Sequence, residues 1–288
     1  MKTLIAGSAG QLGRALRATV PHGVALAAPA EADFDILDAS MVARVVSEHR
    51  PDLVINAAAY TAVDKAEGDL EAAHAVNATA AGTLARAAAD IGAAYVHIST
   101  DFVFDGTSAT PYLPDATPAP LGAYGVTKLA GETAVRALHP APLIIRTAWV
   151  YAAEGNNFVK TMLRLMRERD EVRVVADQLG TPTHAASLAR AIWHLQAAKA
   201  TGIYHWTDAG AASWYDFAVA IQEEAVSIAL LARTVPVVPI RTADYPTPAR
   251  RPAMSVLDKS SSWAITGPAA HWRVELRAAL AAMKELGA

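Results

Sequence analysis

The chain of 288 residues contains no cysteine, which excludes disulfides, thiolate metal sites and a cysteine nucleophile. It has little excess charge of either sign, with a formal net charge of -3. Because no basic cluster is present either, we expect no binding to nucleic acid. Long apolar runs are missing too, so we expect no contact with a membrane. These absences together favour a soluble, cytoplasmic protein.

Hydrophobic residues make up 53% of the chain, and short apolar runs alternate with longer amphipathic ones over its first two thirds. We expect strands over residues 3–6, 24–27, 53–56, 94–99 and 143–146. Helices are expected after the N-cap residue Asp38 and over residues 70–91, 124–138 and 274–286. This alternation predicts an α/β fold, with a doubly wound parallel sheet of the Rossmann type covered on both faces.

After Trp149 the alternation weakens, and proline and glycine become frequent near residues 180–182 and over 235–252. The prolines of the latter segment exclude long helices there. We therefore expect a dinucleotide-binding Rossmann domain over residues 1–150. A smaller, irregular substrate-binding lobe is expected over residues 151–288, with part of 176–206 returning to the Rossmann domain.

Three glycines, Gly7, Gly10 and Gly13, follow the first expected strand and open a helix. The pyrophosphate of a dinucleotide needs bare backbone and a helix N-terminus, and this spacing supplies both. An ordinary strand-to-helix turn rich in small residues would show the same glycines. The position of the loop, directly after the first strand of a βαβ pattern, favours a nucleotide.

The cofactor's adenosine ribose is usually bound by an acid directly after the second strand. Here that strand runs into Pro29, and Glu31, Asp33 and Asp35 come later. No arginine stands at this place for a 2′-phosphate. The preference between NADH and NADPH therefore stays open.

Tyr124 and Lys128 stand four residues apart in an expected helix, which places them on one face. A free phenol has a pKa of about 10, and a neighbouring ammonium would lower this pKa. Such a pair can serve as general acid and base between a carbonyl and an alcohol. A tyrosine and a lysine on an exposed helix would have the same spacing. Thr100, at the end of a strand, could bind a substrate carbonyl or Tyr124, or only cap the strand.

Together these residues resemble the extended short-chain dehydrogenase/reductase superfamily and, within it, the dTDP-4-dehydrorhamnose reductases. The resemblance extends over nearly the whole chain. It is carried by the glycine loop and by residues 50–67, 99–106, 124–128, 146–151, 157–158, 177–183, 202–205, 214–218 and 251–255. The runs over 56–65 and 177–183 are far more specific than the glycine loop.

The resemblance implies NADPH- or NADH-dependent reduction of the C4 ketone of dTDP-4-dehydro-β-L-rhamnose, in the synthesis of dTDP-L-rhamnose. The catalytic residues would be Tyr124, Lys128 and Thr100. The substrate-binding residues would be Thr100, Asp101 and Trp149, although Trp149 could equally be a core aromatic. The cofactor-binding residues would be Gly7, Gly10, Gln11, Leu12, Gly13, Asp35, Ile36, Ala59, Tyr60, Thr61, Tyr124 and Lys128.

One position departs from the pattern. Some members of the family carry a glutamate two residues after the last glycine of the loop, where it contributes to a metal-bridged dimer. Here that residue is Ala15. The resemblance therefore supports neither a magnesium site nor that dimer, and we expect a monomer or a homodimer.

Three alternatives stay open at this stage. A related reductase of another dTDP-4-keto-6-deoxysugar would carry the same catalytic residues. A sugar-nucleotide epimerase would share the Rossmann core and hold NAD tightly. A regulatory subunit like that of eukaryotic methionine adenosyltransferase would use the fold as a binding module without turnover.

Overall fold

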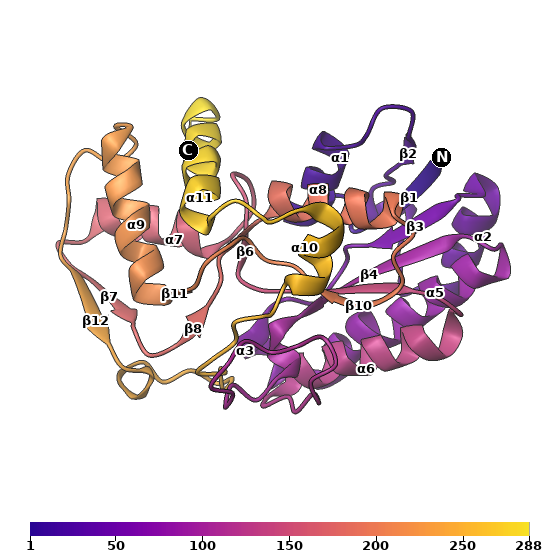
Figure 1. Cartoon of the computed structure of the whole chain (residues 1–288), viewed down its shortest axis with the longest axis horizontal. Coiled ribbons are helices and arrows are strands. Elements are labelled where there is room, and N and C mark those ends of the chain that lie inside the picture. The colour runs from indigo at the N-terminus through magenta and orange to yellow at the C-terminus, as the bar shows by residue number, and fades with distance from the viewer. Residues whose placement is uncertain (288) are drawn as a thin grey trace.

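Six parallel strands form the central sheet of the computed structural model, which describes residues 1–287 (Figure 1). Their order across the sheet is β10-β5-β4-β3-β1-β2, and each neighbouring pair is parallel. The strands are β1 (Lys2–Ala6), β2 (Ala25–Ala27), β3 (Leu53–Asn56), β4 (Ala94–Thr100), β5 (Leu143–Thr147) and β10 (Gly202–His205).

Helices cover both faces of this sheet, because successive strand residues point to opposite sides and both sides are apolar. In β1, Leu4 packs with α2 (Ala39–His49), α5 (Ala81–Asp90) and α6 (Ala123–Leu138). The next residue, Ile5, packs with α1 (Gln11–Ala18) and α8 (Ala185–Ala197) on the other face. The predicted doubly wound parallel sheet is confirmed (Figure 1).

The expected helices are present, and one of them has an unexpected interior. The Asp38 side chain accepts hydrogen bonds from the backbone N–H groups of Ser40 and Met41, so it caps α2 as predicted. The helix expected over residues 70–91 consists of α4 (Leu70–His74), a π-helical turn over Ala75–Ala80, and α5. Such π turns often occur at functional sites.

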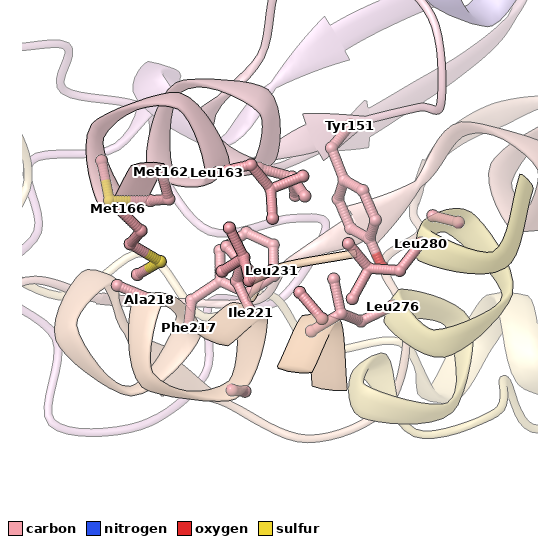
Figure 2. Close-up of a cluster of buried hydrophobic side chains, with 14 of the residues drawn as sticks. Tyr151, Met162, Leu163, Met166, Phe217, Ala218, Ile221, Leu231, Leu276 and Leu280 are labelled. Atoms are coloured by element: carbon pink, nitrogen blue, oxygen red, sulfur yellow. The ribbon is translucent and has the colours of Figure 1, made fainter. Parts of the chain in front are cut away.

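The second lobe is built around an apolar core of its own (Figure 2). Phe217 and Ile221 meet Met166, Leu276 and Leu280 in this core, where all five side chains are buried. They come from three helices, α7 (Phe158–Glu168), α9 (Trp214–Ser227) and α11 (Trp272–Glu285). The proline-rich stretch before residue 252 contains only a short strand and a single 3-10 turn, as its composition predicts.

Short strand pairs and small helices complete the architecture. The pairs are β6 (Val150–Tyr151) with β9 (Thr183–His184), β7 (Val172–Val175) with β12 (Val237–Ile240), and β8 (Leu179–Gly180) with β11 (Ala212–Ser213). The remaining helices are α3 (Val63–Ala66) and α10 (Ser260–Thr266), with 3-10 turns at Glu31–Asp33, Asp101–Val103 and Thr242–Asp244. Between β9 and β11 the chain returns to the large sheet as α8 and β10. Within residues 1–287, no helix has the length and apolar character that a bilayer crossing requires.

Candidate active site

The glycine loop between β1 and α1 is packed too tightly for side chains. A Cβ atom on Gly7, whose φ is +76°, would lie 2.5 Å from the backbone nitrogen of Ala58, and one on Gly13 would lie 2.2 Å from the carbonyl oxygen of Gly7. No side chain caps the first turn of α1, which begins after Gly10. Its N–H groups and the positive end of the helix dipole can therefore receive an anion, so the loop fits a pyrophosphate.

The segment Ala59–Thr61, which follows β3, is fixed by a residue from the π-helical turn. The Asn77 side chain accepts a hydrogen bond from the Tyr60 N–H (2.9 Å) and donates one to the Tyr60 carbonyl (3.1 Å). Its amide also donates to the Thr127 hydroxyl on α6 (3.1 Å). Asn77 therefore holds the loop beyond β3 against the helix that carries Tyr124. Sequence reasoning missed Asn77, because no motif marks a residue 17 positions from its partner.

At the carboxyl end of β4, Thr100 and Asp101 form a buried polar pair. The Thr100 hydroxyl donates to Asp101 Oδ1 (3.0 Å) and accepts from the Phe102 N–H (3.2 Å). Burial raises the pKa of Asp101 to about 6, although the hydroxyls of Ser255 and Thr100 lower it in part. Ser255 belongs to the C-terminal part of the chain, so both lobes contribute to this end of the sheet.

Tyr124 stands in the first turn of α6, next to Thr100. Its ring packs edge-on against Phe102, with 5.5 Å between the ring centroids. The close approach of α6 requires Gly125, since a Cβ there would lie 2.2 Å from the Phe102 carbonyl oxygen. Burial raises the pKa of Tyr124 to about 12, while a hydrogen bond with Thr100 acts in the opposite direction. The expectation that Lys128 lowers this pKa was wrong, because desolvation dominates and the lysine is turned to another partner.

That partner is a backbone carbonyl of β4. The Lys128 side chain is 2% exposed, and its Nζ donates to the Ile98 carbonyl at 2.6 Å. Burial lowers the pKa of Lys128 to about 8, and the charge of Glu132, one turn further along α6, acts against this lowering. Glu132 in turn pairs with Arg146 of β5 through two hydrogen bonds of 2.8 and 2.7 Å. The negative charge of this buried pair therefore favours the ammonium form of Lys128.

Trp149 stands apart from this group, two residues after the end of β5. Its backbone φ is +47°, a conformation that is rare for a bulky residue and often found at functional sites. Its ring stacks on Trp214 of α9 with 3.5 Å between centroids, and a Cβ on Gly180 would lie 2.6 Å from it. Trp149 is therefore an element of the junction between the lobes. Its partner Trp214 lies in the 214–218 run that carries the resemblance, but no role was predicted for it.

The remaining predicted residues occupy three places. Gln11 lies at the first position of α1, where its side-chain oxygen accepts from Asn157 of the second lobe (2.9 Å). Asp35 is exposed and Ile36 half-buried in the segment before α2, where the Leu37 N–H donates to the Asp35 carboxylate. Leu12 packs on the α1 face of the sheet, as does Ala15, where some members of the family carry a glutamate. No group of three or more His, Cys, Asp or Glu side chains within residues 1–287 is placed to hold a metal ion.

Comparisons with known proteins cover nearly the whole chain. The family model of the RmlD substrate binding domain matches residues 1–285. A dTDP-4-dehydrorhamnose reductase from Burkholderia thailandensis is 44% identical over 272 residues, which cover 91% of this chain and 91% of the relative. The crystal structure of a dTDP-4-dehydrorhamnose reductase from Clostridium acetobutylicum matches with a TM-score of 0.93 at 41% identity, covering 99% of this chain and 100% of that one.

A further crystal structure, of dTDP-4-dehydrorhamnose reductase from Bacillus anthracis in complex with NADP, matches with a TM-score of 0.91. It is 37% identical and covers 98% of this chain and 99% of that chain. The second lobe is included in these matches as well as the dinucleotide-binding sheet. They confirm the resemblance that the sequence motifs indicated. The three relatives named above are dTDP-4-dehydrorhamnose reductases, and the chain belongs to the family of the RmlD substrate binding domain.

Proposed function

We propose that this protein reduces the C4 ketone of dTDP-4-dehydro-β-L-rhamnose to dTDP-β-L-rhamnose, with NADPH or NADH as the reductant. The observation that carries the proposal is the position of Tyr124, which α6 holds against Phe102 and beside Thr100 at the carboxyl end of β4. This is the edge of an open α/β sheet at which ligands bind. The family relatives support the substrate and the cofactor.

The cofactor's own contribution is the hydride, which NADPH or NADH supplies when bound. The chain would hold its pyrophosphate on the uncapped N–H groups of Gln11, Leu12 and Gly13. Lys128 would orient the nicotinamide ribose: an ammonium has three donors, and only one is used by the Ile98 carbonyl. Asp35 and Ile36 would lie near the adenine, and residues 59–61 would line the cofactor beyond β3.

Tyr124 would be the proton donor. Since burial raises its pKa to about 12, the phenol is fully protonated at neutral pH and can give its proton to the ketone oxygen as negative charge develops there. Thr100 would position that phenol. Asp101 would contact the sugar, and Trp149, held flat against Trp214, would offer a rigid aromatic surface to the sugar nucleotide.

The decisive experiment measures the loss of NAD(P)H absorbance with dTDP-4-dehydro-6-deoxyglucose in the presence and absence of the 3,5-epimerase. Oxidation that depends on the epimerase supports the rhamnose precursor as substrate, whereas oxidation without it indicates a related ketosugar reductase. No oxidation with either cofactor, from folded protein that binds nucleotide, would move the proposal to an epimerase or a regulatory module. The cytoplasmic location and the state as monomer or homodimer stay predictions.

Removing the phenolic hydroxyl tests the role of Tyr124. Tyr124→Phe should lower turnover by about 10²–10⁴-fold, the usual contribution of a general acid, and leave nucleotide binding intact. The matched control is Tyr245→Phe, which removes the same hydroxyl from an exposed tyrosine of the second lobe and should change neither property. Near-normal turnover of Tyr124→Phe would refute the assignment.

A further inference from the structure

An open cavity of about 720 Å³ lies between the second turn of α1 and the carboxyl end of β2. It is lined by two arginines and one glutamate besides small and apolar residues, namely Arg14, Arg17, Ala18, Leu26, Ala28 and Glu154. Within the part of the chain that the structure describes, Arg17 makes no hydrogen bond or ion pair. The cavity therefore presents positive charge that the protein itself satisfies only in part.

The cavity adjoins the glycine loop. The Ser8 hydroxyl donates to the Pro29 carbonyl at 2.7 Å, which joins the loop to the segment directly after β2. Arg14 Nε donates to the Ala9 carbonyl at 2.7 Å, which holds the guanidinium beside the same loop. In Rossmann proteins this place, between the glycine loop and the end of the second strand, receives the adenosine ribose. An arginine there accommodates a 2′-phosphate, whereas an acid binds a free 2′-hydroxyl.

The charges around the cavity favour the phosphate. The residues that follow β2 are Ala28, Pro29 and Ala30, so the acid that would select a 2′-hydroxyl is missing at that point. A guanidinium binds phosphate through two parallel hydrogen bonds. Among the residues that line the cavity the one opposing group is Glu154, from the loop after β6, whose carboxylate pairs with Arg14 at 2.5 Å. The acids Glu31, Asp33 and Asp35 come only later in the segment after β2 and are exposed. Both side chains are about half exposed, so this pair is weak and a phosphate can replace the carboxylate.

We propose that Arg14 and Arg17 form the clamp for the 2′-phosphate of NADPH and give this protein a preference for NADPH over NADH. Glu154 is the counter-ion of Arg14 in the free protein, and the phosphate replaces the Glu154 carboxylate when the cofactor binds. The proposal rests on the proposed function, because it concerns one end of the same cofactor. Both arginines of the clamp lie on α1, because the segment after β2 contains no arginine.

Calorimetric titration with 2′,5′-ADP and with 5′-ADP tests the clamp without any turnover. The unmodified protein should bind 2′,5′-ADP more tightly. Arg17→Gln and Arg14→Gln should each weaken 2′,5′-ADP binding by about tenfold or more, the loss expected for one charge-assisted contact, and leave 5′-ADP binding nearly unchanged. Glu154→Gln should strengthen 2′,5′-ADP binding, because the competing carboxylate is gone. The matched control is Arg164→Gln on α7, whose guanidinium pairs with Glu168 in the second lobe.

Each other outcome overturns the clamp. Equal affinity of the unmodified protein for the two nucleotides would refute it and leave the proposed reductase function intact. The same loss in Arg164→Gln would mean that overall charge is responsible and not the cavity. If neither nucleotide binds to folded protein, the clamp and the proposed cofactor site fail together, and the reductase assay separately reports on the function.

Discussion

Replacing Glu132 by glutamine should destabilise the protein far more than such a small change would on the surface. The Glu132 carboxylate is 3% exposed and accepts hydrogen bonds from Arg146, at 2.8 and 2.7 Å, and from the Ser99 hydroxyl at 2.5 Å. Arg146 is 2% exposed and has one further acceptor, the Pro114 carbonyl at 3.1 Å. The variant therefore leaves a buried guanidinium without its counter-ion and turns an amide donor toward it.

Breaking a buried ion pair from one side costs about 3–5 kcal/mol, because an uncompensated charge stays inside the protein. With roughly 2–4 °C of melting temperature per kcal/mol for a chain of this size, Glu132→Gln should melt roughly 6–20 °C lower. The matched control is Glu48→Gln on α2, because Glu48 and its partner Arg44 are both exposed. An exposed pair is worth about 0–1 kcal/mol, so the control should hardly change the melting temperature.

Thermal unfolding of both variants at a fixed scan rate and neutral pH measures the difference. Glu132→Leu combined with Arg146→Met should recover much of the lost stability, because apolar side chains can replace a buried pair at little cost. A melting temperature for Glu132→Gln equal to that of the control would refute the reasoning. A second readout is the pH profile: losing the Glu132 charge should lower the pKa of Lys128 further, so the alkaline limb of activity moves to lower pH.

Three more outcomes follow from the structure. Burial raises the pKa of Asp208 to about 7, so the folded state keeps a proton that the unfolded state releases. The free energy of unfolding should therefore fall as the pH rises from about 4 to about 7, and the melting temperature of Asp208→Asn should decline less over this range. Gly13→Ala places a Cβ 2.2 Å from a loop carbonyl and should abolish nucleotide binding in a titration, whereas Gly68→Ala, with its nearest atom 4.0 Å away, should not. Trp214→Ala removes the stacking partner of Trp149 and should raise KM for the dTDP-sugar about 2–10-fold; an unchanged KM would contradict that role.

Local patterns in the sequence were sufficient for most of the sheet. Each strand of the β1, β3, β4 and β5 group is a short apolar run, and such a run needs burial on both faces wherever it lies in the chain. The Asp38 cap and the helix carrying Tyr124 were likewise predicted correctly, since a cap and a four-residue spacing are properties of neighbouring residues. The π-helical turn at Ala75–Ala80 was not predicted, because its composition is that of an ordinary alanine-rich helix.

The residues of the candidate site also fall into those that local spacing predicts and those that it does not. The glycine loop and the Tyr124/Lys128 pair are visible as spacings, and their roles stay predictions until turnover is measured. Asn77 and Glu132 were missed, and no role was predicted for Trp214, because each acts on a residue from a distant segment.

What the sequence determined by itself is therefore the order of elements, the glycine loop and the residue types at the end of β4. Only the tertiary structure decided the pKa values of those residues and the side chains and backbone groups that they contact. The pKa of Tyr124 rises because protein atoms replace water around the ring, and no spacing along the chain reports that. Arg14 lies beside Leu26 and Ala28 at the end of β2 because α1 packs there, although Arg14 is far from both residues in the sequence. Desolvation and long-range contact depend on what covers a group, so they are fixed only when the chain has folded.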